Sequence, residues 1–162
     1  MLDIKILGDD VLKKQASLVP KVDRQIKDLI EAMFETMHEG KGVGLAAPQI
    51  GELKRLFVCH ATDDKPRVFI NPEIIATSEE QNIYEEGCLS IPDVWADVLR
   101  PAWITVQARD ENGKLFTLEA TGFLARVIQH EIDHLNGVLF IDRINEKKRQ
   151  RILKTFGKNV KV

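Results

Sequence analysis

The sequence has few cysteines, no long apolar segment and no strong excess of charge. Only Cys59 and Cys88 are present among 162 residues, too few for a disulfide framework and typical of a reducing compartment. One disulfide between them is the alternative to two free thiols. No stretch approaches the roughly 20 apolar residues that span a bilayer, and the N-terminus lacks an apolar signal segment. We therefore expect a soluble, cytoplasmic protein without a membrane partner.

The charge of the sequence does not indicate a class of partner. The formal net charge is −2, which provides no general attraction to nucleic acid or anionic lipid, so no specific nucleic-acid site is predicted. Basic residues gather only near the C-terminus, at Lys147, Lys148, Arg149 and Arg151. A transient contact with the ribosome is one interpretation of this cluster, and an ordinary solvated helix face is the favoured one.

Length and composition predict a single domain that spans residues 1–162. Hydrophobic residues make up 44% of the chain, enough for a substantial core, and no repeat or low-complexity linker divides it. Apolar residues recur at helical spacing from Asp23, a plausible N-cap, to Gly40. This pattern predicts an amphipathic helix whose Met33 and Met37 pack in the core.

The middle of the chain has the composition of β-strands. Short β-rich runs cover residues 55–60 and 68–70, and residues 72–77 are expected to continue the second run. Alternating apolar residues over 104–120 enclose Asn112-Gly113, a pair typical of tight hairpin turns. An antiparallel hairpin is therefore predicted in this segment.

Two further helices are predicted towards the C-terminus. After Thr121 as N-cap, apolar residues at helical spacing continue to Asn136-Gly137, which indicates a central, largely buried helix. Another helix is expected from about Asn145 to Phe156, with Gly157 as its stop. Helices that interleave with antiparallel strands predict an α+β domain, in which antiparallel β-sheets surround the central helix.

The central helix contains the HExxH pattern, His130-Glu131-Ile132-Asp133-His134. Two histidines four residues apart share one face, about 6 Å apart along the axis, so both rings can bind one ion. Glu131 lies beside that face, where it can exchange a proton with a metal-bound water. The alternative is a pair of hydrogen-bonded histidines with an exposed glutamate between them. Asp133 is either an orienting group behind the ligands or a plain structural or solvated carboxylate.

A catalytic metal site needs a third protein ligand and an open position for water. Cys88 follows Gly87 in a segment that resembles a strand end or turn, which can present a thiolate together with a free backbone N–H. Cys88 is therefore the expected third ligand. Cys59 lies in an apolar run and fits a buried core thiol, and the adjacent His60 has no partner at ligand spacing.

The segment from Gly42 to Gln49 combines glycines and small residues ahead of one amide side chain. It is equally well explained as a loop with a tight turn and as a substrate-binding segment. In the second interpretation Gly42 and Gly44 let the backbone approach a substrate, and Gln49 donates a hydrogen bond to a developing oxyanion.

Three motifs together resemble the signature motifs of the peptide deformylases, in the same order and at similar spacing. They are GVGLAAPQ at 42–49, EGCLS at 86–90 and QHEIDH at 129–134. The resemblance covers almost the whole chain. It implies that one divalent metal ion is held by Cys88, His130 and His134, with Glu131 as general acid/base and with the Gln49 side chain and the Leu89 N–H as oxyanion donors.

The resemblance also implies an activity. Members of the family remove the formyl group from the N-terminal N-formylmethionine of newly synthesised polypeptides and release formate. The ion is typically Fe²⁺, and Zn²⁺, Ni²⁺ or Co²⁺ suits the same ligands. Metal-bound hydroxide attacks the formyl carbon, and Glu131 passes a proton to the departing amine. The implied partners are N-formylmethionyl nascent peptides, and a monomer is expected.

The resemblance places the methionine side chain in a pocket around Phe123, Arg126 and Val127. The aliphatic stem of Arg126 is expected to line this pocket while its charge reaches solvent. We further expect the backbone near Gly44 to leave no volume for the methyl group of an acetylated substrate. Some relatives carry an arginine where this chain has Trp95, which is expected to form an apolar rim.

Two competing hypotheses use the same HExxH pattern. A metallo-endopeptidase would take a downstream glutamate as third ligand, for which Glu146 is the candidate, although no matching motif surrounds it. A non-catalytic domain with a structural metal would need a fourth protein ligand, and the sequence contains no convincing one.

Overall fold

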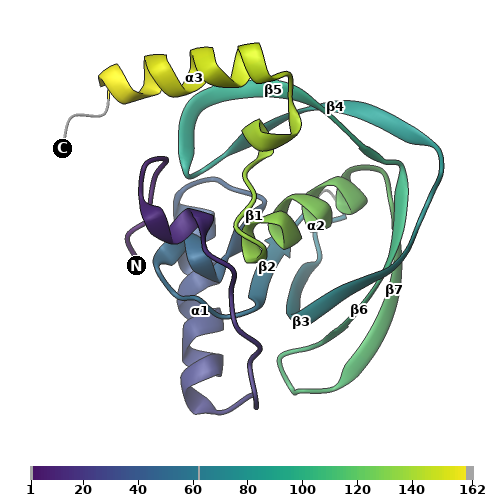
Figure 1. Ribbon diagram of the computed structural model, residues 1–162. Coiled ribbons are helices and arrows are strands. Elements are labelled where there is room, and N and C mark those ends of the chain that lie inside the picture. Colours follow the sequence, from purple (N-terminus) through teal and green to yellow (C-terminus); the bar gives the residue numbers. More distant parts are fainter. Residues whose placement is uncertain (1, 62, 160–162) are drawn as a thin grey trace.

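The computed structural model of the protein describes residues 2–61 and 63–159. Its helices and strands, including three short 3-10 helices (η), are drawn in Figure 1. In chain order they are η1 (Asp10–Lys13), α1 (Arg24–Glu39), β1 (Gly44–Ala46), η2 (Ala47–Ile50), β2 (Leu56–His60), β3 (Pro66–Thr77), β4 (Gln81–Cys88), β5 (Ile91–Pro101), β6 (Trp103–Arg109), β7 (Leu115–Thr121), α2 (Gly122–Leu135), η3 (Phe140–Arg143) and α3 (Glu146–Asn159).

The strands form two antiparallel sheets, with α2 in the middle of the molecule (Figure 1). The larger sheet has five strands in the order β1-β2-β3-β6-β7, and the smaller is the two-stranded ribbon β4-β5. Helix α2 packs against β1, β2, β6 and β7 and is joined by side-chain contacts to β4 and β5. The predicted α+β class, with antiparallel sheets around a central helix, is confirmed.

Helix α1 follows the sequence pattern closely. The Asp23 side chain accepts a hydrogen bond from the Ile26 N–H at 3.0 Å, which satisfies one of the free donors of the first turn. Met33 and Met37 are fully buried, as predicted, in a cluster that includes residues of β1, β2 and β3. The apolar stripe of α1 thereby packs against the β1–β3 part of the large sheet.

The predicted strands are confirmed, including the expected continuation of the second run. Residues 68–70 and 72–77 belong to a single strand, β3, because irregularities in its pairing with β6 accommodate Pro72 within the strand. The predicted hairpin consists of β6 and β7. Its turn contains Gly113 at φ +78°, and the Asp110 carboxylate accepts hydrogen bonds from two backbone N–H groups of the turn.

The two C-terminal helices differ in how they end. Helix α2 begins after Thr121, whose side chain makes no capping bond. Beyond its end, Gly137 adopts φ +75°, and a Cβ there would lie 2.5 Å from the Lys13 carbonyl oxygen, so only glycine fits. Helix α3 continues past Gly157 to Asn159, so the predicted stop at Gly157 is wrong. A glycine within a helix costs about 1 kcal/mol, which weakens the helix without ending it.

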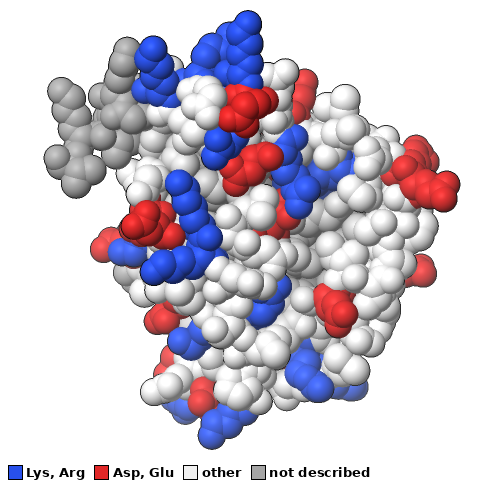
Figure 2. Space-filling view, viewed as in Figure 1, with Lys and Arg blue, Asp and Glu red and all other residues white. Residues whose placement is uncertain are grey.

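The apolar side of α3 packs on the body of the protein, as predicted. Ile152, Leu153 and Phe156 are partly buried against a cluster that includes residues of β5 and η3. Lysine and arginine side chains gather at the top of the view in Figure 2, where α3 lies. Across the described residues, no helix combines the length and apolarity needed to cross a membrane.

Candidate metal centre

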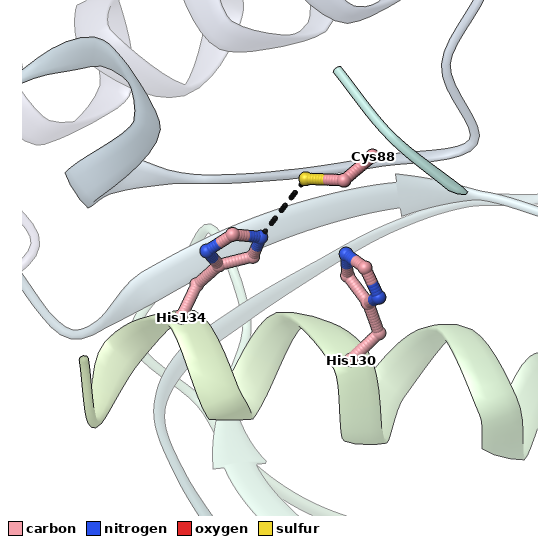
Figure 3. Close-up of side chains that lie close together, drawn as sticks. All are labelled: Cys88, His130 and His134. Carbon is pink, nitrogen blue, oxygen red and sulfur yellow. Dashed lines mark hydrogen bonds between the residues drawn. The ribbon is translucent and has the colours of Figure 1, made fainter. Parts of the chain in front are cut away.

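The side chains of Cys88, His130 and His134 converge between the β4-β5 sheet and helix α2 (Figure 3). One ligand atom from each residue can be chosen so that all three lie within 4.8 Å of one another. The Cys88 Sγ lies 3.3 Å from His134 Nε2. The two rings come from successive turns of α2, and the sulfur comes from the last residue of β4. The predicted three-residue cluster is therefore present in the fold.

This cluster has the chemistry and the size of a metal site. An ion bound at normal metal–sulfur and metal–nitrogen lengths in tetrahedral geometry separates such ligand atoms by about 3.6 Å. The Cys88 Sγ–His134 Nε2 distance of 3.3 Å is close to this value, and the other two separations are no more than 4.8 Å, so side-chain movements of about 1 Å suffice. Among the described residues no fourth histidine, cysteine or acidic residue joins the cluster, which leaves a position for water or substrate.

Glu86 orients His130 from behind, and the sequence analysis did not identify it. The His130 Nδ1–H donates to Glu86 Oε1 at 2.9 Å, which leaves Nε2 free to face the cluster. A signal for this role was available in the sequence. Because side chains alternate along a strand, Glu86 shares the inner face of β4 with Cys88, two residues further on.

Glu86 belongs to a buried network of charged side chains. Arg100 donates to both of its carboxylate oxygens, at 2.7 and 3.0 Å, and Arg126 donates to one at 2.8 Å. Burial alone would raise the pKa of Glu86, but the bonds from His130 and Arg100 outweigh it and hold this pKa well below its usual range. Glu86 therefore remains an ionised carboxylate, and it accepts a hydrogen bond from the protonated Nδ1 of His130.

The expected position of the Arg126 charge is wrong. Its stem lines the cavity next to the cluster, but its guanidinium is buried rather than in solvent. Besides Glu86, the guanidinium donates to the backbone oxygens of Val98 and Asn82 and to the Asn82 side chain. These acceptors, together with the Tyr84 ring 5.0 Å away, replace the hydration that the charge would otherwise need.

Asp133 supports the site indirectly. Its carboxylate is buried and accepts hydrogen bonds from Arg100 at 2.8 Å and from Arg143 at 2.6 and 2.7 Å. No bond to either histidine ring is present within the described structure. Of the two roles considered from the sequence, Asp133 has the structural one, because it holds Arg100 in position against Glu86.

Glu131 lies in a dry environment beside the cluster. The side chain is buried, and Oε1 has no hydrogen-bond partner among the described residues. Burial raises the pKa of Glu131 to about 7. A Cβ on Gly44 would lie only 2.5 Å from Glu131 Oε2, so the missing side chain at Gly44 makes room for this carboxylate. Gly44 therefore has a role that the sequence analysis did not anticipate.

Gln49 and Leu89 both lie next to Cys88, Gln49 in space and Leu89 in the chain. The Gln49 amide accepts a bond from the Ala46 N–H at 2.9 Å and donates to Ser90 Oγ at 3.0 Å. Its nitrogen lies 3.5 Å from Cys88 Sγ. The Leu89 N–H has no acceptor in the described part of the chain. Both groups are thus donors next to the metal ligands.

A cavity of about 580 Å³ opens next to the cluster. Phe123, Arg126 and Val127, the residues that the resemblance indicated, line it, and so do Gly42 and Gly44 of the glycine-rich segment. Gly42 also leaves space for the Leu89 side chain, which a Cβ would meet at 2.6 Å. Trp95 forms part of the rim, half exposed, with its indole against Gly87. The expected apolar rim is therefore present.

The other cysteine and the other two histidines lie outside the cluster. Cys59 is fully buried, and burial raises the pKa of its thiol to about 12, consistent with a core residue and with two free cysteines. His60 has a partner that its sequence spacing did not reveal. Its Nδ1 lies 3.0 Å from His38 Nε2, and its Nε2 lies 3.0 Å from Asp64 Oδ1.

Comparisons with known proteins agree with this architecture. A family model described as polypeptide deformylase matches residues 1–150. A peptide deformylase of Treponema pallidum is 50% identical over 156 residues, 96% of each chain, and one of Rhizobium meliloti is 51% identical over 160 residues, 96% of this chain and 92% of that one. The crystal structure of Ehrlichia chaffeensis peptide deformylase with actinonin superposes with a TM-score of 0.96 at 38% identity, covering 99% of this chain and 98% of the other.

Proposed function

The chain belongs to the polypeptide deformylase family, hydrolases that remove N-formyl groups from nascent peptides, and we propose a metal-assisted mechanism that uses the cluster described above. The observation that carries the proposal is the convergence of Cys88, His130 and His134 beside a buried glutamate. This arrangement combines a three-ligand metal site with a proton-transferring group on the same helix.

Cys88, His130 and His134 would hold one divalent ion, which we propose to be Fe²⁺. One thiolate and two imidazoles also suit Zn²⁺, Ni²⁺ or Co²⁺. When bound, such an ion supplies an acidified water and polarises the formyl oxygen. Glu86 fixes the His130 tautomer for this purpose, because its carboxylate can only accept the Nδ1 proton.

Glu131 acts as the general acid and base in the proposal. Its raised pKa, about 7, lets the carboxylate take a proton from the attacking water and return it to the departing methionine amine. The products are formate and a free amino terminus. Burial of Glu131 also strengthens its interaction with charges that develop nearby.

Gln49 and Leu89 stabilise the negative charge that develops on the formyl oxygen. The bond from the Ala46 N–H holds the Gln49 amide with its nitrogen towards Cys88. The Leu89 N–H is a donor from the neighbouring turn. Losing one such donor typically raises the barrier by about 3 to 4 kcal/mol.

Substrate selectivity follows from the shape of the cavity. The methionine side chain would lie against Phe123, Val127 and the Arg126 stem, which line it. The close approach of Gly44 and the Glu131 carboxylate would leave no volume for the methyl group of an acetyl substrate. Efficient turnover of an N-acetylmethionyl peptide by the unmodified protein would contradict this explanation.

The competing hypotheses have less support in the structure. Glu146, the candidate third ligand of an endopeptidase, is exposed at the start of α3, pairs with Arg149 and accepts a bond from Gln150. It does not line the cavity at the cluster. A structural metal would need a fourth protein ligand, and no fourth candidate accompanies the cluster within the described residues.

Formate release from formyl-Met-Ala-Ser by iron-loaded protein tests the proposal. Glu131→Gln keeps the size of the side chain but removes its acid–base function, so kcat should fall by about a hundredfold to ten-thousandfold. Metal content, measured by mass spectrometry, should stay near one ion per chain. If Glu131→Gln releases formate at the rate of the parent protein, the proposed role of Glu131 is wrong.

The identity of the metal has a separate test. Iron held by a thiolate is sensitive to air, because the ion or the Cys88 sulfur is oxidised. The iron form should lose activity during aerobic storage, and the nickel form should retain it. Equal persistence of both forms, with the iron content verified, would contradict an oxygen-sensitive iron centre.

A further inference from the structure

A second groove lies beside the proposed catalytic cavity, between α3 and the start of β5, which lie side by side in Figure 1. It also has a volume of about 580 Å³, within the range of sites that bind small molecules. Apolar side chains and two cations line it, namely Ile6, Val94, Ile152, Phe156, Lys148 and Arg151. We call this site the α3 groove.

The α3 groove adjoins the catalytic cavity. Pro92 and Asp93 line both, so these two residues form a ridge between them. Asp93 adopts φ +63°, an uncommon backbone conformation for a residue other than glycine. Both ridge residues are exposed, so an extended chain can cross them without opening the fold. At about 3.4 Å per residue, a few additional residues of an extended peptide would carry it from one site into the other.

The charges of the α3 groove favour an acidic occupant. Neither Lys148 nor Arg151 forms an ion pair or side-chain hydrogen bond with any described residue. Their neighbour Arg149, by contrast, pairs with Asp142 and Glu146 on another side of the helix. The groove therefore presents two uncompensated cations against the single carboxylate of Asp93.

We propose that the downstream part of the nascent peptide crosses Pro92 and Asp93 and binds in the α3 groove. This inference rests on the proposed function, because it assigns the occupant of the groove to the same substrate. The apolar side chains of the peptide contact the Ile152 and Phe156 side of the groove, and its acidic residues pair with Lys148 and Arg151. The groove thus distinguishes substrates by residues well beyond the methionine.

Formylated peptides of two lengths test the inference. The short substrate is formyl-Met-Ala-Ser, and the long substrates extend it by six residues that are rich in glutamate, in serine or in lysine. For the unmodified protein, kcat/KM should be highest with the acidic extension, about fivefold above the lysine-rich one at low salt. The difference should appear in KM and should shrink as salt is added.

Charge-reversal variants locate the effect. Lys148→Glu combined with Arg151→Glu should abolish or reverse the preference for acidic extensions, while kcat/KM for the short substrate stays unchanged. The matched control is Lys147→Glu combined with Lys154→Glu, which makes the same change in net charge on side chains of α3 that do not line the groove. This control should keep most of the preference.

A bulky side chain tests occupancy independently of charge. Thr155 is exposed and lines the groove, so Thr155→Trp should fill it and raise KM for every long peptide but not for the short one. The inference is overturned if kcat/KM of the unmodified protein does not depend on the extension, or if the control pair loses as much preference as the groove pair. Absence of formate release from the short substrate would instead refute the proposed function itself.

Discussion

The protein contains two histidine pairs of nearly the same ring geometry but different chemistry. The rings of His130 and His134 have centroids 5.1 Å apart and planes at 68°, and those of His38 and His60 are 5.2 Å apart at 72°. Ring proximity alone therefore does not distinguish a metal site. The difference lies in the direction of the nitrogens and in what surrounds them.

In the His38–His60 pair, the nitrogens face each other. They are 3.0 Å apart, so one ring donates a hydrogen bond to the other, and Asp64 engages the remaining His60 nitrogen. In the buried pair, His130 uses its outer nitrogen for Glu86, and Cys88 adds a sulfur where the inner nitrogens point. The comparison indicates that a third ligand and a group behind the ring, rather than two close histidines, make the metal site.

The largest expected effect comes from removing the third ligand. Cys88→Ala should reduce bound metal from about one ion per chain to a small fraction and lower formate release at least about a thousandfold, because two imidazoles alone hold the ion weakly. Metal analysis after gel filtration, with an activity assay, checks this. Retention of a full equivalent of metal by the variant would show that the sulfur is not a ligand.

A substitution at Gly44 tests the contact between β1 and Glu131 in the buried site. Gly44→Ala puts a methyl group where Glu131 Oε2 now lies, so the carboxylate must move and kcat should fall about a hundredfold while metal content is unchanged. Gly40→Ala is the matched control, because its Cβ would meet the flexible end of Leu89 at 3.3 Å and the Thr36 carbonyl oxygen at an ordinary contact distance of 3.5 Å, and not Glu131. Equal losses of kcat in the two variants would argue against a specific role of Gly44.

A substitution at Glu86 tests whether the carboxylate behind the His130 ring contributes to metal binding. Glu86→Gln removes the only carboxylate that pairs with Arg126 among the described residues and leaves Arg100 with Asp133 alone, so the affinity for the metal should fall by about tenfold to a hundredfold. The free energy of unfolding should fall by about 3 kcal/mol. Glu85→Gln, on the exposed face of the same strand, is the control for both measurements. A Glu86→Gln protein with parent-like metal affinity would remove Glu86 from the description of the site.

Cys59, the register partner of Gly44, provides a test of pH dependence. Burial raises the pKa of its thiol from 9.0 to about 12, so above pH 9 the unfolded chain loses a proton that the folded chain keeps. Unfolding is then favoured as the pH rises. Between pH 9 and pH 10 the free energy of unfolding of the parent should fall by about 1 kcal/mol more than that of Cys59→Ala. Denaturant unfolding at both pH values measures this difference. An equal fall in the free energy of unfolding for the parent and for Cys59→Ala would contradict it.

The smallest effect is expected at the exposed pair. His38→Ala should leave metal content and kcat/KM unchanged and alter the free energy of unfolding by less than about 1 kcal/mol, since a single partly exposed hydrogen bond is lost. Mass spectrometry of bound metal gives the decisive reading. Loss of a second metal equivalent in this variant would mean that the two histidine pairs are chemically alike after all.

Most of the fold could be predicted because its signals are local. The capping of α1 by Asp23, the turn at Gly113 and the HExxH spacing each depend on residues within a few positions of one another. The continuation of α3 through Gly157 was missed because a glycine signals a helix end only when it adopts a left-handed conformation. The residue type alone does not reveal which backbone conformation a glycine adopts.

The sequence by itself determined the ligand types and the family resemblance. It also determined that His130 and His134 share one face of α2, because a helix turns by a constant angle per residue. Only the tertiary structure decided that Arg126 is buried rather than solvated, that Glu86 and Asp133 share Arg100, and that His38 meets His60. These contacts join residues 10 or more positions apart, and burial makes each charge depend on partners that no local pattern reveals.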